Sequence, residues 1–245
     1  MYNNFAKYYD ILMSDVDYDA RTDYVLSLFD KFGGRPTLLL DLACGSGEFS
    51  NRFASRGISV IGVDISEEML CIAREKSEKQ GNDILYICQP AQNLELYGTV
   101  NGAVCMLDSL NHITNYDEFC EVFIKVSAFL EKNSLFIFDM NTVYKHEKIL
   151  SDNAFLIEDN DVFCAWQNFY NESDHTTDIF LDFFEKLGEK YVRSSESFSE
   201  RAYNADEISA ALNRAGLKLE AVFGDMSNKM PKADEERMFF VARKV

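Results

Sequence analysis

A short stretch around residue 40 constrains the fold of this chain more than any other part of its sequence. The apolar residues 38–40 lead into Asp41, and the sequence Leu-Ala-Cys-Gly-Ser-Gly follows before a helix-like pattern begins at Glu48. This order predicts a strand, a tight glycine turn and a helix, which together open a nucleotide-binding α/β fold. Glycine accepts φ > 0 and leaves backbone N–H groups open to a ligand. The N-terminus of the helix then favours a carboxylate or a phosphate.

A second apolar stretch supports the same interpretation. Residues 58–63 have a strand pattern that ends at Asp64. This acid lies about twenty residues beyond the glycine turn, the spacing expected of a carboxylate that receives ribose hydroxyls at the tip of the second strand. The two stretches in this order therefore predict a ligand that contains a nucleoside.

The charge of the chain narrows the class of substrate. Its 41 Asp and Glu outnumber its 24 Lys and Arg, which gives a formal net charge of −17, and it has no basic cluster. Nucleic-acid binding depends largely on Lys and Arg that neutralise phosphates, so a nucleic-acid partner is disfavoured and a small molecule such as an amine is favoured. The sequence has no run of about eighteen apolar residues and no apolar signal core at its N-terminus. We therefore expect a cytoplasmic protein without a membrane span.

Cysteine and histidine usage disfavours disulfides and metal. The six cysteines include no C-x-x-C pair, and only three histidines are present. Most of the cysteines lie in apolar patterns, where a free cysteine behaves as a small buried hydrophobe. We therefore expect no metal site.

The two opening motifs resemble those of a known family. The sequences DLACGSGEFS (41–50) and VIGVDIS (60–66) resemble the class I S-adenosylmethionine-dependent methyltransferases, and the likeness continues through 107–111 to 198–203. The dinucleotide oxidoreductases are the nearest rival, but Ser50 stands where their third glycine is expected. The resemblance implies a methyltransferase of EC 2.1.1.- that uses S-adenosyl-L-methionine. Motif-level similarity to amino-sugar and glycine N-methyltransferases implies N-methylation of a small amine.

The fold expected is an α/β Rossmann-like methyltransferase fold with a mixed, mostly parallel seven-stranded sheet. Strand patterns interrupted by turn-rich pieces over residues 151–198 predict an inserted antiparallel β meander. We expect a cofactor-binding domain over 1–150 and 199–245, and a subdomain over 151–198 that covers the pocket. Residues 2–33 are predicted to be helical, with a polar stretch between two apolar segments.

The resemblance also assigns residues to the cofactor. The glycine loop would receive its methionine part, Asp64 its ribose, and Ile65, Met69 and Ala91 its adenine. Family members carry an acid where this chain has Pro90, so the contact of that acid with adenine is either absent or made by a neighbouring glutamine. The residues assigned in this way are Asp41, Ala43, Cys44, Gly45, Ser46, Gly47, Asp64, Ile65, Met69, Gln89, Pro90, Ala91 and Leu107.

Five residues are candidates for contact with the methyl acceptor. Asp108 and Asn111 follow the fourth strand, and ligands of open parallel sheets bind beyond such strand ends. His112 could act as a base, which would suit O-methylation, although a lone histidine is more often structural. The resemblance adds Tyr9 from a tyrosine-rich N-terminal helix and Tyr203 from the E-R-x-Y segment. Capping or core packing is the alternative role for each of these residues.

Two other functions stay open at this stage. A non-catalytic binding module of the same fold would explain Pro90, but Asp41, the glycine loop and Asp64 are all intact. A nicotinamide-dependent oxidoreductase would be expected to show the third glycine of its fingerprint, but Ser50 stands at that position. The expected partner is a small-molecule methyl acceptor, and the chain could be a monomer or a homodimer.

Overall fold

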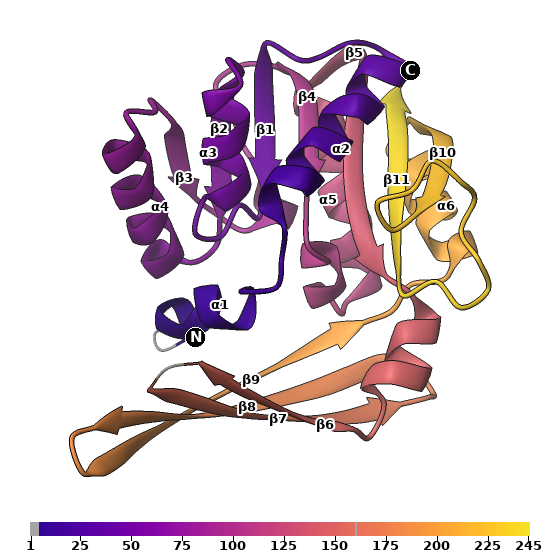
Figure 1. Cartoon of the computed structure of the whole chain (residues 1–245). Helices are drawn as coiled ribbons and strands as arrows, with labels where there is room; N and C mark the ends of the chain where they lie inside the picture. The colour runs from indigo at the N-terminus through magenta and orange to yellow at the C-terminus, as the bar shows by residue number, and fades with distance from the viewer. Residues whose placement is uncertain (1–4, 160) are drawn as a thin grey trace.

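Two separate sheets make up the framework of the molecule (Figure 1). The computed structural model describes residues 5–159 and 161–245. The larger sheet has seven strands in the order β10-β11-β5-β4-β1-β2-β3. Its strands are β1 (Leu38–Leu42), β2 (Ser59–Asp64), β3 (Leu85–Cys88), β4 (Val100–Cys105), β5 (Leu130–Asn141), β10 (Leu217–Gly224) and β11 (Arg237–Lys244).

The strand pairing confirms the predicted mixed sheet. The pairs among β1 to β5 are parallel, and β11 runs antiparallel to both of its neighbours, β5 and β10. The parallel strands therefore share one carboxyl edge, and the segments that follow β1, β2 and β4 all begin there.

Helices cover both faces of this sheet because their apolar stripes need a partner. One core contains buried residues of α2 (Tyr18–Phe32) and α3 (Glu48–Ser55), and the other contains those of α5 (Tyr116–Phe129) and α6 (Ala205–Arg214). The helix α4 (Glu67–Gln80) packs beside β3. Two 3₁₀ turns, η1 (Ala91–Asn93) and η2 (Ser109–His112), follow β3 and β4. No helix among the described residues is long and apolar enough to cross a membrane.

The second sheet is an antiparallel meander of four strands in chain order. Its strands are β6 (Ala154–Asp159), β7 (Val162–Asn171), β8 (Thr176–Leu187) and β9 (Lys190–Arg201), and the π-helical turn η3 (Lys145–Leu150) leads into it from β5. The helix α1 (Phe5–Leu12) lies between the two sheets (Figure 1). Tyr8 of α1 stacks on Phe183 of β8 with ring centroids 4.5 Å apart. This contact attaches the N-terminal helix to the meander.

Candidate active site

The glycine loop after β1 is a tight turn that the end of β2 holds in place. Ala43, Gly45 and Gly47 all have positive φ, of 56°, 54° and 76°. The backbone N–H of Gly45 donates to Asp64 Oδ2 at 2.8 Å, and that of Ser66 donates to Asp64 Oδ1 at 2.9 Å. Burial raises the pKa of Asp64, and the hydrogen bonds from backbone N–H groups oppose this effect. Asp64 thus lies against the loop as the two motifs predict.

Asp41 links β1 to the helix that follows the loop. Its carboxyl group is buried and accepts a 2.5 Å hydrogen bond from Ser50 Oγ of α3. Burial raises the pKa of Asp41 to about 7; the Ser50 hydrogen bond opposes this shift and the charge of Asp64 adds to it. The residue therefore acts as a buried anchor at the base of the loop.

A small cavity opens beside this loop and brings together six of the predicted site residues. They are Tyr9, Asp41, Ala43, Cys44, Ser46 and Leu107. Tyr9 comes from α1, so the N-terminal helix closes the side of the cavity that faces the meander. The volume of this cavity is only about 20 Å³, so the surrounding side chains nearly close it, and its place for the methionine part of the cofactor stays a prediction.

The residues predicted for the adenine lie at the ends of β2 and β3. Ile65 is 61% exposed directly after Asp64, so it offers an apolar surface to a ring. Met69 is buried, and its Cε lies 3.6 Å from the position that a Cβ on Gly45 would take. A planar apolar ligand at Ile65 would thus lie beside the ribose position at Asp64.

The side chain of Gln89 has a structural partner. Its amide donates to the carbonyl of Glu95 and accepts from the N–H of the same residue, both at 3.2 Å. Gln89 therefore closes the loop that contains Pro90 and Ala91. One N–H and one lone pair of its amide are thus committed to the loop backbone.

A second, larger cavity of about 480 Å³ adjoins the first, because Leu107 lines both. It lies at the carboxyl ends of β4 and β5 and reaches the last residues of β9. Its walls include Asp108, Asn141, Lys145, Trp166, Glu200 and Arg237. We call this cavity the acceptor cleft.

Asp108 projects into the acceptor cleft from a strained turn. Leu107 and Asp108 have φ of 55° and 51°, and their N–H groups donate to the carboxylate of Asp139 at 3.0 and 2.7 Å. Arg237 lies between the two acids, 2.6 Å from Asp139 Oδ1 and 2.6 Å from Asp108 Oδ1. Burial raises the pKa of Asp108, but the positive charge of Arg237 and its neighbours outweighs burial and lowers that pKa to about 2. Asp108 is therefore ionised.

Three of the predicted acceptor residues, Asn111, His112 and Tyr203, line neither cavity. Asn111 is fully buried, donates to the carbonyls of Asn141 and Arg201, and accepts from the N–H of Asn141. Tyr203 is 2% exposed, stacks on Phe119 at 3.8 Å and donates its hydroxyl hydrogen to a main-chain carbonyl. These contacts correct the expectation that Tyr203 lines the pocket. The chain turns into the core directly after β9 and carries this ring with it.

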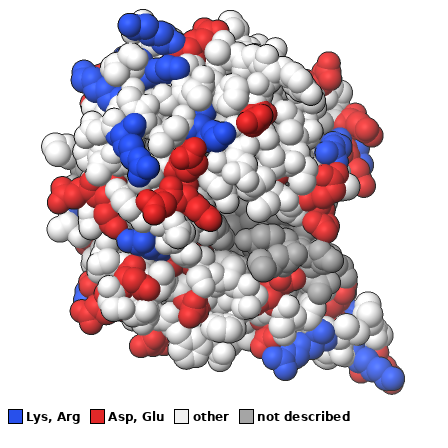
Figure 2. Space-filling view, turned by 180° about the vertical axis from the view of Figure 1, so that it is seen from behind, with Lys and Arg blue, Asp and Glu red and all other residues white. Residues whose placement is uncertain are grey.

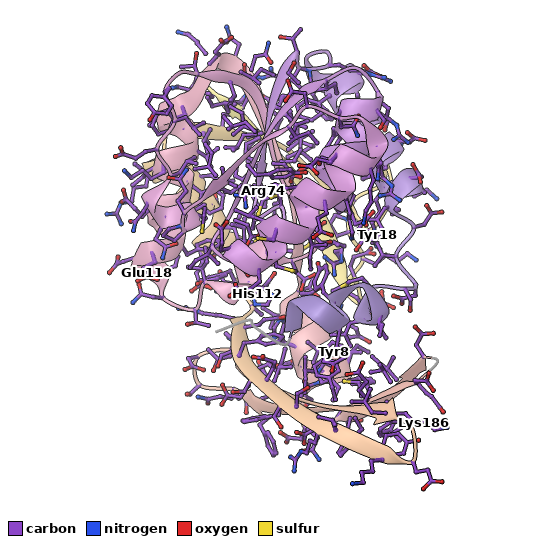
Figure 3. The ribbon with its side chains drawn as sticks, turned by 90° about the vertical axis from the view of Figure 1, so that its left-hand side faces the viewer. Tyr8, Tyr18, Arg74, His112, Glu118 and Lys186 are labelled. Atoms are coloured by element: carbon purple, nitrogen blue, oxygen red, sulfur yellow. The ribbon has the colours of Figure 1, made fainter. Side chains whose placement is uncertain are left out.

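A buried carboxylate lies between two histidines beside the cleft. Glu200 Oε1 is 3.6 Å from His112 Nε2, and Glu200 Oε2 is 3.8 Å from His146 Nε2. His146 Nδ1 lies 2.8 Å from Thr177 Oγ1. Figure 3 places His112 at the junction of the larger sheet with the meander. Neither Glu200 nor His146 was among the residues predicted from the sequence.

Burial sets the ionisation states of Glu200, His112 and His146. Burial, assisted by the charge of Asp108, raises the pKa of Glu200 to about 8. Burial lowers the pKa of His112, and it lowers that of His146 to about 4. Both histidines are therefore neutral near pH 7.

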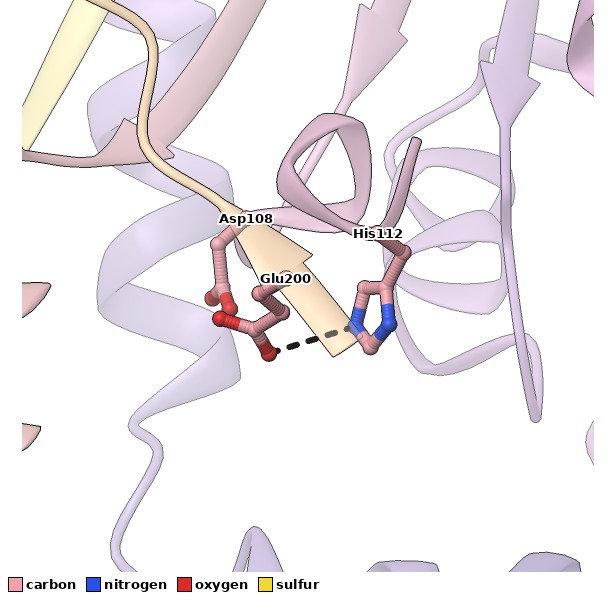
Figure 4. Close-up of side chains that lie close together, drawn as sticks. All are labelled: Asp108, His112 and Glu200. Atoms are coloured by element: carbon pink, nitrogen blue, oxygen red, sulfur yellow. Dashed lines mark ion pairs between the residues drawn. The ribbon is translucent and has the colours of Figure 1, made fainter. Parts of the chain in front are cut away.

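Asp108, His112 and Glu200 also offer three ligand atoms within 4.8 Å of one another (Figure 4). A divalent cation could use such a spacing, but Arg237 already binds Asp108, and Lys145 lines the same cleft. The cations compete with a metal for these carboxylates. The absence of a metal stays a prediction.

Comparisons with known proteins agree with this geometry. A methyltransferase domain model matches residues 39–133. YqeM of Bacillus subtilis (strain 168), named as a provisional methyltransferase, is 34% identical over 246 residues, which cover 100% of this chain and 97% of YqeM. The crystal structure of an S-adenosylmethionine-dependent methyltransferase from Clostridium acetobutylicum ATCC 824 is 32% identical with a TM-score of 0.90, over 99% of this chain and 98% of that one.

A more distant structure shares the fold. CalS10, an amino pentose methyltransferase from Micromonospora echinaspora, has a TM-score of 0.77 at 16% identity and covers 95% of this chain and 93% of its own. The matches to YqeM and to the Clostridium protein extend over both sheets and the site. The chain belongs to the class I S-adenosylmethionine-dependent methyltransferases.

Proposed function

We propose that this enzyme methylates a small molecule at the nitrogen of an amine. The observation that carries the proposal is the meeting of two cavities at Leu107, one beside the glycine loop and one lined by the carboxylates of Asp108 and Glu200. S-adenosylmethionine supplies a methyl group bound to a positively charged sulfur, which is reactive without further activation. The protein then contributes chiefly by holding the acceptor in line.

The glycine loop and the ends of β2 and β3 suit the methyl donor. Backbone N–H groups and the helix N-terminus at Gly47 suit the carboxylate of its methionine part, and Asp64 suits its ribose. The exposed side chain of Ile65 provides an apolar support for adenine. Ala91 begins η1 directly after Pro90. Its backbone N–H is present whatever residue precedes it, so this contact with adenine does not depend on the missing acid.

The acceptor cleft suits a substrate that carries a positive charge. Its volume of about 480 Å³ is in the range of sites for small ligands. Asp108 is ionised, and a second carboxylate, Glu200, lies beside it (Figure 4). An ammonium group beside them would be attracted by the charge of Asp108, whereas Glu200, whose pKa burial raises to about 8, is mostly protonated near pH 7 and offers a hydrogen-bond acceptor. The name of CalS10 records an amino pentose as the substrate of that protein, which agrees with an amine here.

The remaining partner assignments belong to the same proposal. We expect no nucleic-acid partner, because acidic side chains are spread over the molecule and mix with the basic ones on the face shown in Figure 2. All six cysteines are free, which supports a cytoplasmic location. We also expect a monomer or a homodimer that does not associate with a membrane.

A titration followed by a paired screen tests this function. Calorimetric titration should show micromolar binding of S-adenosylmethionine and S-adenosylhomocysteine and no binding of NADH. Transfer of labelled methyl groups is then compared for D-glucosamine, glycine and ethanolamine and for their hydroxyl counterparts D-glucose, glycolate and ethylene glycol. Methylation of an amine but not of its counterpart supports the proposal. Methylation of the hydroxyl compounds alone would contradict it, and no binding of either sulfur compound would favour a non-catalytic binding module.

A further inference from the structure

Glu200 is a buried acid whose second oxygen has no hydrogen-bond partner. The residue is 5% exposed near the end of β9, and its Oε2 atom makes no hydrogen bond within the part of the chain that the structure describes. His146 Nε2 is unsatisfied in the same way. An unpaired buried polar group keeps its full cost of desolvation, so a pair of them beside a cavity indicates that a ligand or a proton is received there.

The surroundings of Glu200 leave this carboxylate available. Its distances of 3.6 Å to His112 Nε2 and 3.8 Å to His146 Nε2 are too long for hydrogen bonds. Glu200 also lines the acceptor cleft, on the side that the end of β9 contributes. A nitrogen in the cleft would thus find Oε2 without a hydrogen-bond partner, while the side chain of Asn141 bonds to the same carboxyl group.

We propose that Glu200 is the general base that takes a proton from the methyl acceptor and passes it to His112. The proposal rests on the amine methylation argued above. His112 is the relay because its side chain is 33% exposed, whereas that of His146 is fully buried. His146 is then a positioning residue that holds the meander at Thr177.

The proton balance is simple. An amine binds as its ammonium form and gives one N–H proton to the carboxylate of Glu200, which becomes a neutral acid. The nitrogen lone pair that is left forms the new N–C bond while the C–S bond of the donor breaks and its electron pair stays on sulfur. Glu200 gives its proton to the neutral ring of His112, which releases it to water. The carboxylate is then restored for the next turnover.

Titratable groups surround Glu200 from three elements and one turn. His112 belongs to η2, His146 and Lys145 to η3, and Asp108 precedes η2; Arg237 begins β11. Burial and the charge of Asp108 raise the pKa of Glu200 to about 8, and the positive charge of Lys145 and Arg237 limits this rise. A base with a pKa near the working pH transfers protons most effectively. Further along the cleft lie Asp15, Asp17, Arg21, Asp225 and Glu236.

Kinetics of Glu200 variants test the role directly. The acceptor is whichever of D-glucosamine, glycine and ethanolamine the wild-type enzyme methylates fastest. Glu200→Gln should lower kcat about 100-fold and remove the rise of kcat with pH that ends near pH 8. Glu200→Ala should regain activity in added formate, which fits the space of the missing carboxylate. Glu189→Gln, the same change of charge at the exposed tip of the β8–β9 hairpin, should behave as the wild type does.

A second measurement separates this proposal from the proposed function. The ring resonances of the three histidines are followed by NMR from pH 5 to pH 9 in the wild-type chain and in Glu200→Gln. An inflection near pH 8 at His112 and His146, lost in the variant, is expected even if none of the amines is methylated. A kcat that stays within threefold of wild type in Glu200→Gln, or the same inflection in both chains, would overturn the assignment of Glu200.

Discussion

The backbone N–H of Gly45 donates to Asp64 Oδ2 across 2.8 Å, so the glycine loop after β1 and the tip of β2 hold each other in place. The other oxygen of the same carboxylate accepts from Ser66, which caps α4 through its hydroxyl group. One acid therefore joins the loop, the strand end and the next helix. This arrangement places the carboxylate where a ribose could reach it.

Asp64→Ala should weaken the binding of S-adenosylmethionine by about 3 kcal/mol, or about 150-fold. The variant loses two charge-assisted hydrogen bonds to the ribose and the acceptor of the Gly45 N–H. Calorimetric titration measures the effect, with Asp83→Ala as an exposed carboxylate control just beyond α4. Equal affinity in Asp64→Ala and the wild type would remove Asp64 from the cofactor site.

Gly47→Ala should destabilise the fold more than the same change at Gly57. Both glycines have positive φ, 76° and 83°, so both variants incur backbone strain of about 1 kcal/mol. Only at Gly47 would the new Cβ also lie 2.7 Å from Tyr86 Oη and 2.9 Å from Ala73 Cβ, which adds roughly 1–3 kcal/mol of overpacking. Urea unfolding should rank the variants in this order. Equal losses would show that the contact with α4 relaxes freely.

The caps of the helices follow local signals in the sequence. Ser66 accepts from the N–H of Met69, Gly81 ends α4 at φ 71°, and Asn204 forms a capping box with Glu207. Each of these features depends on residues within one helical turn, so the pattern alone contains the information. The mixed, mostly parallel seven-stranded sheet followed from the resemblance, and the strand pairing confirms it.

The break between α1 and α2 shows what local signals leave out. Residues 13–17 contain neither glycine nor proline, yet the helix stops there and restarts after Asp17, which accepts from the N–H of Ala20. The reason is tertiary. Tyr8 packs on the meander, while Tyr24 packs edge-to-face on Phe239 of the larger sheet. The helix α1 therefore packs on the meander, and α2 packs on the larger sheet.

The candidate site also combines residues that short motifs reveal with residues that only the tertiary structure brings together. The glycine loop and Asp64 were found from short motifs, whereas Glu200 and His146 belong to elements far from them in the sequence. An acid at the end of a strand with many polar residues gives no sign that its side chain turns inward. Likewise, the polar character of Asn111 and Tyr203 did not reveal that their partners are main-chain groups. The direction of each side chain and its hydrogen-bond partner depend on the tertiary structure.

Arg237→Ala should cost about 3–5 kcal/mol of stability, because it leaves two buried carboxylates without their cation. Arg193→Ala breaks an exposed pair with Asp182 and should cost less than about 1 kcal/mol. Urea unfolding of both variants gives the comparison. Adding Asp108→Asn to Arg237→Ala should restore part of the loss, since one unpaired charge is then removed. A loss for Arg237→Ala no larger than that for Arg193→Ala would show that water reaches the pair.

Asp41→Asn should change how stability depends on pH. Burial raises the pKa of Asp41 to about 7 in the folded chain, against about 3.9 in an unfolded one. The folded state therefore binds a proton that the unfolded state has lost, so this residue's contribution is complete below about pH 4 and disappears as the pH rises through 7. Unfolding free energies measured from pH 4 to pH 8 should fall less steeply in Asp41→Asn than in the wild type. In Ser50→Ala the loss of the 2.5 Å hydrogen bond should move the upper end of this window to higher pH, because that bond favours the ionised carboxylate. Parallel curves for Asp41→Asn and the wild type would mean that the carboxyl group is already ionised at pH 4 in the folded enzyme.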